Sequence, residues 1–513
     1  MEGERVYNAA VDFIDRNVAE GRGDKVAYCD PGRKLTYAQL HDAVTRVGPM
    51  LARLGLEPEH RIAMVMHDTL EFPILFWGAV RAGIIPVLLN TRLTAEQYRY
   101  LFADMRAKAI FAAASLLPVV RETANGLPSV KHIVSVGAGD EEALRFESLL
   151  AAETRGSPAA ATSPDEIAYW LYSSGSTGMP KGVLHVHSSP RMMAERVSRQ
   201  RFGVKQDDVI FSAPKAFFAY GIANTIFTSP WLGTTAVLYP ERPTPEAVFE
   251  IFREHRPSVF FCVPTLYASI LDDPSCTRRD GSDRLRLCVS AGEPLPAHLG
   301  EEWKKRFGVD IVNGVGSSET GHMYLTNLPG AVDYNVSGVA IEGFELKLVD
   351  ALGERVAEGE LGEMMVRSPT GAAGYWNQRD KSRRTFEGEW IRTGDKYSFA
   401  GGAYSFRGRA DDMFKVSGIW VSPFEVEAAL ISHDRVLEAA VVPTEDAAGL
   451  IKPKAFVVLK DSREPSGQRD ALRDELKAHV KATCGPWKYP RFIEFVDGLP
   501  KTATGKIRRF MLR

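Results

Sequence analysis

Cysteines are few in this chain, and none lies in a C-x-x-C pair. A chain of 513 residues can bury a large hydrophobic core and needs no disulfide framework, so a disulfide-rich secreted scaffold is excluded and zinc binding is not indicated. We therefore expect reduced thiols and a cytoplasmic location. The five cysteines are Cys29, Cys262, Cys276, Cys288 and Cys484.

The sequence also lacks an excess of charge and a long apolar run. The 63 lysines and arginines nearly balance the 65 aspartates and glutamates, with a formal net charge of -2, so no nucleic-acid partner is indicated. The most apolar window, residues 72–80, is followed by Arg81 and is too short to span a bilayer. Glu2, Glu4 and Asp12 interrupt the start of the chain, where a secretory signal would need an apolar stretch. We expect no membrane partner.

Short apolar runs that alternate with amphipathic segments predict an α/β fold. The chain is 45% hydrophobic and 25% charged, as is typical of folded globular proteins, and its length favours two or more domains. A strand over residues 61–66, a helix over 70–83 and a strand over 84–90 form a βαβ unit. Such units need crossover connections, so we expect a large region with mostly parallel sheets. Further strands are predicted at residues 108–114, 132–137, 167–174, 208–214, 258–264, 285–292 and 310–316.

The pattern changes twice toward the C-terminus. After residue 333, short alternating strands rich in turn residues predict a small β-rich subdomain. The final segment predicts a small α+β domain, with helices over residues 423–433 and 470–482. We place the division so that residues 1–410 form the N-terminal domain and residues 411–513 form the C-terminal domain.

The segment Y-S-S-G-S-T-G-M-P-K-G at residues 172–182 follows an apolar strand and predicts a phosphate-binding loop. Glycines let the backbone approach an anion closely, hydroxyls supply hydrogen-bond donors, and a lysine adds positive charge. It is not a Walker A loop, which would place a hydroxyl residue directly after the lysine. A flexible Ser/Gly linker is the alternative. The predicted phosphate-binding residues are Ser173, Ser174, Gly175, Ser176, Thr177, Gly178 and Lys181.

Five more motifs follow the phosphate loop in order. With that loop they resemble the adenylate-forming superfamily of acyl-CoA synthetases, luciferases and peptide-synthetase adenylation domains. The resemblance extends from about Tyr37 to the end of the chain. Ser318 replaces the family's threonine and retains the hydroxyl. The motifs are S-A-G-E-P at 290–294, G-S-S-E at 316–319, W-I-R-T-G-D at 390–395, G-R-A-D-D-M-F-K-V-S-G at 408–418 and P-K-T-A-T-G-K at 500–506.

This resemblance implies an ATP-dependent ligase that forms an acyl-AMP and then a CoA thioester. Glu319 would hold the Mg²⁺ that bridges ATP phosphates, a role suited to a hard oxygen ligand, and Lys506 would be the catalytic lysine. Asp395 would accept hydrogen bonds from the ribose, and Arg409 would contact the phosphate or ribose. Asp411 would be the hinge about which a mobile C-terminal lid domain, which carries Lys506, swings. The resemblance also assigns Ala291, Gly292, Glu293, Ser318 and Lys506 to the ATP site, and Lys415, Ser417 and Gly418 to the CoA channel.

The predicted acid site resembles that of benzoate and 4-hydroxybenzoate CoA ligases. Aromatic side chains there would form an apolar wall around a flat ring. The phenylalanines at 217 and 218 could equally fill the core, and the histidine could be an ordinary buried one. The predicted pocket residues are Phe218, Ala219, Tyr220, His322 and Met323.

Several alternatives stay open. The chain could activate another aryl acid or a fatty acid, load a carrier protein, or bind nucleotide without catalysis. The pair His185-x-His187 has no third ligand in view, so a metal site there is not favoured. We expect ATP, Mg²⁺ and CoA as cofactor and co-substrates, an aromatic carboxylate as the partner, and a monomer or homodimer.

Overall fold

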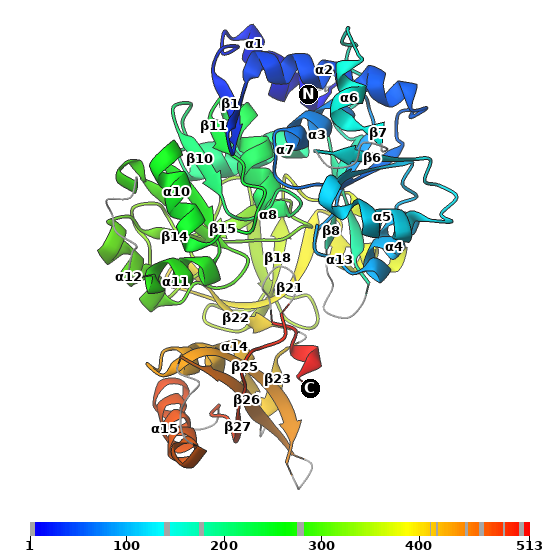
Figure 1. Cartoon of the computed structure of the whole chain (residues 1–513). Coiled ribbons are helices and arrows are strands. Elements are labelled where there is room, and N and C mark those ends of the chain that lie inside the picture. The colour runs from blue at the N-terminus through cyan, green and yellow to red at the C-terminus, as the bar shows by residue number, and fades with distance from the viewer. Residues whose placement is uncertain are drawn as a thin grey trace.

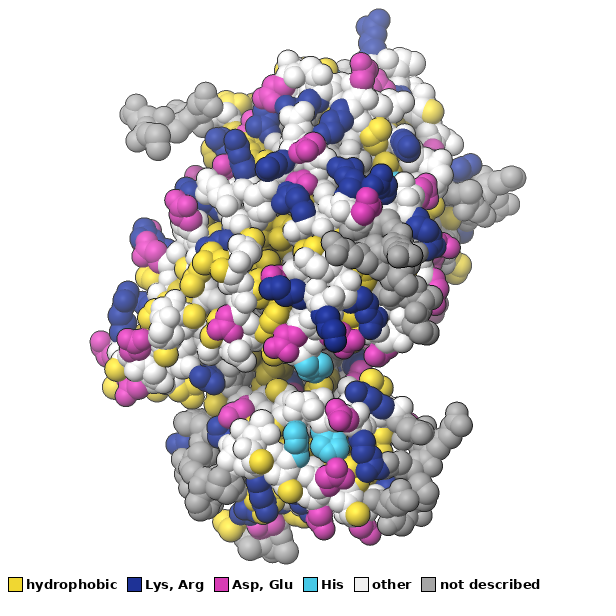
Figure 2. Space-filling view, turned by 90° about the vertical axis from the view of Figure 1, so that its left-hand side faces the viewer, with side chains coloured by type: hydrophobic (Ala, Val, Ile, Leu, Met, Phe, Trp, Pro, Cys, Tyr) yellow, Lys and Arg dark blue, Asp and Glu magenta, His cyan; other side chains and the backbone are white. Residues whose placement is uncertain are grey.

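The computed structural model of this chain (Figure 1) describes residues 6–137, 144–173, 179–273, 282–410, 412–416, 419–446, 450–460, 466–485, 488–501 and 507–512. The large N-terminal part lies above a smaller C-terminal part in this view. Figure 2 shows acidic and basic side chains interspersed over one face, with a waist between the two parts.

The predicted βαβ unit is confirmed and belongs to a mostly parallel sheet. It consists of β3 (Arg61–Val65), α3 (Glu71–Arg81) and β4 (Ile85–Leu88). Within the described residues the strand order is β19-β9-β8-β4-β3-β5-β6-β7, and the antiparallel pairs are β8–β9 and β9–β19. The other strands are β5 (Ala109–Ala113), β6 (His132–Val136), β7 (Leu144–Arg145), β8 (Ile167–Ser173), β9 (Lys181–Val186) and β19 (Gly374–Tyr375).

A second sheet of the N-terminal part is also mostly parallel. Its order over the described chain is β16-β15-β14-β13-β12-β10-β11-β1-β2, and it is parallel from β14 through β1. Antiparallel strands lie at its two edges. Its strands are β1 (Val26–Asp30), β2 (Arg33–Thr36), β10 (Val209–Ser212), β11 (Thr235–Val237), β12 (Val259–Cys262), β13 (Leu287–Ala291), β14 (Ile311–Gly316), β15 (Met323–Thr326) and β16 (Val339–Ala340).

Helices connect these strands, and several begin where the sequence supplies a cap. At α2 (Tyr37–Arg53), Thr36 and Gln39 form a reciprocal capping box that satisfies two backbone N–H groups. Thr244 caps α10 (Pro245–His255), where a proline suits the first helical position. Other helices are α4 (Ala95–Asp104), α5 (Leu117–Ala124), α6 (Phe146–Ala151), α7 (Ser189–Met193), α8 (Ala219–Ile222), α9 (Thr228–Leu232), α11 (Pro264–Asp272) and α12 (Ala297–Phe307).

The apolar helix α3 is the centre of the main core. All of its residues are buried, and its Trp77 ring stacks on Phe13 at 4.6 Å and donates a hydrogen bond to the Ile226 carbonyl at 3.2 Å. The same core contains residues of both sheets, so it joins them into one body. In the described parts of the chain, no helix is both long and apolar enough to cross a membrane.

The two smaller units predicted toward the C-terminus are also present. An antiparallel sheet contains β17 (Glu345–Val349), β18 (Gly362–Arg367), β20 (Phe386–Glu387), β21 (Trp390–Ala400) and β22 (Ala403–Arg409), and α13 (Arg379–Thr385) lies before β20. Beyond it, β23 (Phe414–Val416) pairs with β24 (Ile419–Val421). A final sheet of β25 (Val436–Glu445), β26 (Ile451–Leu459) and β27 (Phe492–Phe495) lies with α14 (Pro423–Ile431) and α15 (Ser466–Cys484) in the lower part of Figure 1.

Candidate active site

The predicted phosphate loop connects two paired strands. β8 ends at Ser173 and β9 begins at Lys181, and these two residues face each other across the antiparallel ladder. Because the loop connects two adjacent strands, the hydrogen bonds between these strands fix both of its ends. The predicted residues Ser174, Gly175, Ser176, Thr177 and Gly178 lie outside the described residues.

Glu319 is brought to the end of this loop. It follows β14, at the carboxyl edge of the second sheet, where ligands of open α/β sheets bind. Its Oε1 accepts hydrogen bonds from the Tyr375 hydroxyl at 2.8 Å and the Ser173 hydroxyl at 3.4 Å. Its backbone carbonyl accepts from Ala372 N–H at 2.8 Å. Two segments far apart in sequence therefore hold one carboxylate beside the phosphate loop.

Lys181 faces the same carboxylate from the other strand. Its Nζ lies 4.2 Å from the centre of the Tyr375 ring, a cation–π contact. Burial lowers the pKa of Lys181, Glu319 opposes that shift, and the positive charges of Lys381 and Arg409 add to it. A crowded positive site of this kind favours an anion such as a phosphate.

The residues predicted to bind the nucleotide lie at the end of β13 and on the paired strands β21 and β22. Ala291 ends β13 and is buried, and Gly292 follows it with a positive φ of 90°, so the chain turns sharply toward Glu293. Asp395 and Arg409 lie opposite each other on β21 and β22, and the guanidinium donates to the Asp395 carboxylate at 2.9 Å. Arg409 thus orients the carboxylate predicted to bind ribose.

The predicted acid pocket is built from two segments. Phe217 is buried in the main core and Phe218 is half-buried, with their rings packed edge to face at 4.6 Å, so Phe218 is the more accessible of the two. Ala219 begins α8, and the Tyr220 hydroxyl donates to the Val289 carbonyl at 3.1 Å. This bond ties the acid segment to the strand that ends at Ala291.

His322 and Met323 form the second segment. Met323 begins β15 and is buried. His322 is 3% exposed, and neither of its ring nitrogens has a hydrogen-bond partner in the described structure. Burial lowers the pKa of His322 to about 3, so the ring is neutral near pH 7, with one donor and one acceptor nitrogen. An enclosed, unsatisfied imidazole of this kind suits a polar ligand group.

Asp68 is a supporting residue that the sequence analysis missed. It is buried after β3, and both carboxylate oxygens lie 3.2 Å from the Ala216 N–H at the start of the acid segment. Burial raises the pKa of Asp68 to about 6, although Lys215 and the Ala216 N–H oppose the shift. An acid directly after a buried parallel strand was the available signal. Tyr375 was also missed, and its distance in sequence from Glu319 gave no signal.

The predicted CoA residue Lys415 lies on β23 and is exposed. Elsewhere in the C-terminal domain, Arg509 donates to the buried Glu427 at 2.6 Å and lies 3.4 Å from Asp412. These contacts hold the end of the chain beside the predicted hinge. The hinge Asp411, the channel residues Ser417 and Gly418, and Lys506 lie outside the described residues.

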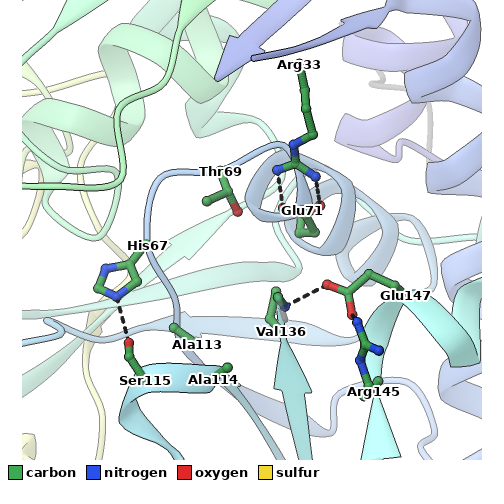
Figure 3. A pocket seen from close by; sticks show the side chains of 11 residues that line it. Arg33, His67, Thr69, Glu71, Ala113, Ala114, Ser115, Val136, Arg145 and Glu147 are labelled. Atoms are coloured by element: carbon green, nitrogen blue, oxygen red, sulfur yellow. Dashed lines mark hydrogen bonds and ion pairs between the residues drawn. The ribbon is translucent and has the colours of Figure 1, made fainter. Parts of the chain in front are cut away.

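A separate cavity of about 460 Å³ lies at the carboxyl ends of β3, β5 and β6 (Figure 3). His67 contacts Ser115 there at 3.3 Å, and Arg33 is paired with Glu71. Because the second arginine, Arg145, also lies near an acid, the cavity has no excess of positive charge. It contains none of the predicted ATP, acid or CoA residues.

Comparison with known proteins identifies the family to which the chain is similar. The chain matches the AMP-binding enzyme family over residues 15–376 and the AMP-binding enzyme C-terminal domain over residues 425–506. It is 60% identical over 512 residues to the 4-hydroxybenzoate–CoA/benzoate–CoA ligase of Rhodopseudomonas palustris. The matched residues cover 99% of this chain and 94% of that protein.

Two solved structures are similar over nearly the whole chain. A benzoate CoA ligase from Burkholderia xenovorans has a TM-score of 0.91 and 44% identity, with 99% of this chain and 100% of that chain covered. An anthranilate CoA ligase in complex with anthranoyl-AMP has a TM-score of 0.94 and 39% identity, with 100% of this chain and 98% of that chain covered.

Proposed function

The chain belongs to the AMP-binding enzyme family, and we propose that it is an ATP-dependent aryl acid:CoA ligase whose substrate is 4-hydroxybenzoate or benzoate. The observation that carries this proposal is the joining of Ser173, Lys181 and Glu319 into one anion site, with the predicted aryl pocket on the segment that follows Glu319. The reaction has two steps, because a carboxylate is a poor acyl donor until its oxygen is made a leaving group.

In the first step, a carboxylate oxygen of the acid attacks the α-phosphorus of ATP. A new P–O bond forms, the bond to pyrophosphate breaks, and the product is aryl-AMP. Positioning and charge neutralisation supply most of the rate in phosphoryl transfer. The charged groups proposed to act here are Lys181, Arg409 and Lys506, with Asp395 holding the ribose.

Glu319 is the proposed ligand of Mg²⁺. Its carboxylate and the neighbouring Ser173 hydroxyl are hard oxygen donors of the type that this ion prefers, so the residues present fit the metal. When bound, Mg²⁺ would neutralise charge on the ATP phosphates. Tyr375 donates to the same carboxylate and keeps it oriented.

In the second step, the CoA thiol attacks the acyl carbon and AMP leaves, with the thiol proton released. We propose that residues 411–513 rotate about Asp411 between the steps, which removes Lys506 and brings Lys415, Ser417 and Gly418 to the CoA channel. A hinge needs only a few residues whose φ and ψ change.

The acid site favours a flat ring over a flexible chain. Phe218 and Tyr220 provide aromatic contacts worth about 0.5–1.5 kcal/mol beyond area burial. The neutral His322 can donate one hydrogen bond to the acid without bringing a positive charge into the pocket.

The test is a panel of benzoate, hydroxylated and aminated benzoates, cinnamate and octanoate with ATP, Mg²⁺ and CoA, in which pyrophosphate and acyl-CoA are both measured. Benzoate or 4-hydroxybenzoate should have the highest kcat/KM. A preference for octanoate would overturn the aryl pocket, and pyrophosphate release without acyl-CoA would overturn free CoA as the acceptor.

A further inference from the structure

His185 lies beneath the turn that carries Glu319, although it is outside the predicted site. It is on β9, fully buried, and its ring stacks on Tyr169 at 4.9 Å with an interplanar angle of 11°. Its Nε2 lies 2.9 Å from the backbone carbonyl of Ser318. The imidazole therefore bridges the phosphate-loop strand and the residue directly before Glu319.

The contact defines the tautomer of His185. A carbonyl oxygen only accepts, so Nε2 must carry the hydrogen and Nδ1 must be the unprotonated nitrogen. Nδ1 is buried and has no hydrogen-bond partner within the described residues. Burial lowers the pKa of His185 to about 4, which keeps the ring neutral near pH 7. Phenylalanine would fill such a position without an unsatisfied nitrogen, so packing alone does not account for a histidine.

The turn above His185, residues 318–321, is closely packed, which restricts its movement. The Ser318 carbonyl also accepts from Gly321 N–H at 3.2 Å, which closes the turn. Gly321 has a φ of 74°, and a Cβ there would lie 2.0 Å from the Met193 methyl and 3.2 Å from His185 Cε1. Tyr169, His185 and Met193 thus form a platform on which the turn lies.

The turn joins the two halves of the site. Glu319 lies within this turn, between Ser318 and Gly321 in the sequence. His322 of the acid segment is the next residue after Gly321. The Thr320 hydroxyl donates to the His322 carbonyl at 2.8 Å, and the Thr370 hydroxyl donates to the Thr320 carbonyl at 2.6 Å. A displacement of the turn would therefore move Glu319 and His322 together.

We propose that His185 is a positioning residue for adenylation: its Nε2–H holds the Ser318 carbonyl and thereby sets the position of the Glu319 carboxylate. This inference rests on the proposed role of Glu319 as the Mg²⁺ ligand. Residues that orient metal ligands from behind commonly contribute about 10- to 100-fold to metal affinity or activity.

The test compares two substitutions at one position. His185→Phe keeps a ring to stack on Tyr169 but removes the donor, whereas His185→Gln keeps an amide N–H that can reach the Ser318 carbonyl. We expect His185→Phe to raise the Mg²⁺ concentration needed for half-maximal ATP binding by about 10-fold, and His185→Gln to restore it to within about threefold of wild type. Calorimetric titration of Mg²⁺ and a non-hydrolysable ATP analogue measures this without any acid substrate.

His187→Phe is the matched control. His187 is also buried, but its Nδ1 accepts from Ala9 N–H at 3.2 Å, a contact with the start of the chain and not with the turn. The His187→Phe substitution should lower the melting temperature and leave the Mg²⁺ requirement at the wild-type value. Comparable increases in the Mg²⁺ requirement for the His187→Phe and His185→Phe variants would overturn the proposal.

Two other results would also contradict the positioning role. One is an unchanged Mg²⁺ requirement in His185→Phe. The other is an equal shift in His185→Phe and His185→Gln, because a merely structural role does not depend on a retained donor. The titration is independent of the acid, so an enzyme that prefers octanoate would overturn the aryl proposal and leave this result standing.

Discussion

Gly321→Ala tests how closely the Glu319 turn is fitted to its platform. Gly321 has a φ of 74°, where an alanine costs about 1–2 kcal/mol. Its new Cβ would also lie 2.0 Å from the Met193 methyl, and overpacking of this kind typically costs about 1–3 kcal/mol. The two effects together predict a destabilisation of about 2–5 kcal/mol and a displaced turn.

Gly330→Ala is the matched control for that substitution. Gly330 has a φ of 82°, but a Cβ there meets nothing within 4 Å, so the variant experiences backbone strain alone. The difference between the two variants isolates the collision with Met193. Because a chain with several domains need not unfold in one step, the two variants are compared by the shift of one unfolding transition that both of them show.

The assays are differential scanning fluorimetry and aryl-CoA formation. A misplacement of about 1 Å in a site can cost about 100-fold in rate, so we expect Gly321→Ala to lose about that much kcat/KM and Gly330→Ala to stay near wild type. Adding Met193→Ala to Gly321→Ala should recover part of the loss, since it removes the colliding methyl. Equal melting temperatures and equal turnover of the two glycine variants would refute the reasoning.

Three further substitutions test other parts of the account. Lys506→Ala should slow aryl-AMP formation by about 100- to 1,000-fold yet spare thioester formation from supplied aryl-AMP, and equal damage to both steps would count against its role. Asp411→Pro, which fixes φ, should retain adenylation and lose thioester formation; retention of both would remove the hinge assignment. Asp68 has a folded-state pKa of about 6, above its ordinary 3.8, so burial of its charge destabilises the fold above pH 6 and that effect fades as the pH falls. Asp68→Asn should therefore melt at a higher temperature than wild type at pH 8, with a gain that shrinks toward pH 4, and a gain independent of pH would contradict this.

Many strands of the two large sheets could be predicted from the sequence because each of them is a short apolar run with its own boundaries. The helix predicted over residues 70–83 is α3, and the strand predicted over 61–66 is β3. The period of apolar residues and the flanking turn residues are local signals, and here both agree with the packing. The mostly parallel sheets followed from the alternation of strands and helices.

The contacts that assemble the site could not be predicted in the same way. Tyr375 reaches Glu319 because the short strand β19 pairs with β9, and no local pattern announces that pairing. Asp395 faces Arg409 because both lie within paired strands, although T-G-D alone is typical of a turn. His185 was weighed only as a metal ligand, since its partner is a backbone carbonyl that the sequence does not mark. Long-range contacts of this kind depend on the tertiary fold.

The measurement that tests the central claim most directly uses benzoate labelled with ¹⁸O in both carboxylate oxygens. If a carboxylate oxygen attacks the α-phosphorus and the thiol later breaks the acyl C–O bond, AMP should contain one ¹⁸O, pyrophosphate none, and benzoyl-CoA one. Mass spectrometry of the three products gives this count. Label in pyrophosphate or inorganic phosphate, or benzoyl-CoA formed with unlabelled AMP, would contradict an aryl-AMP intermediate.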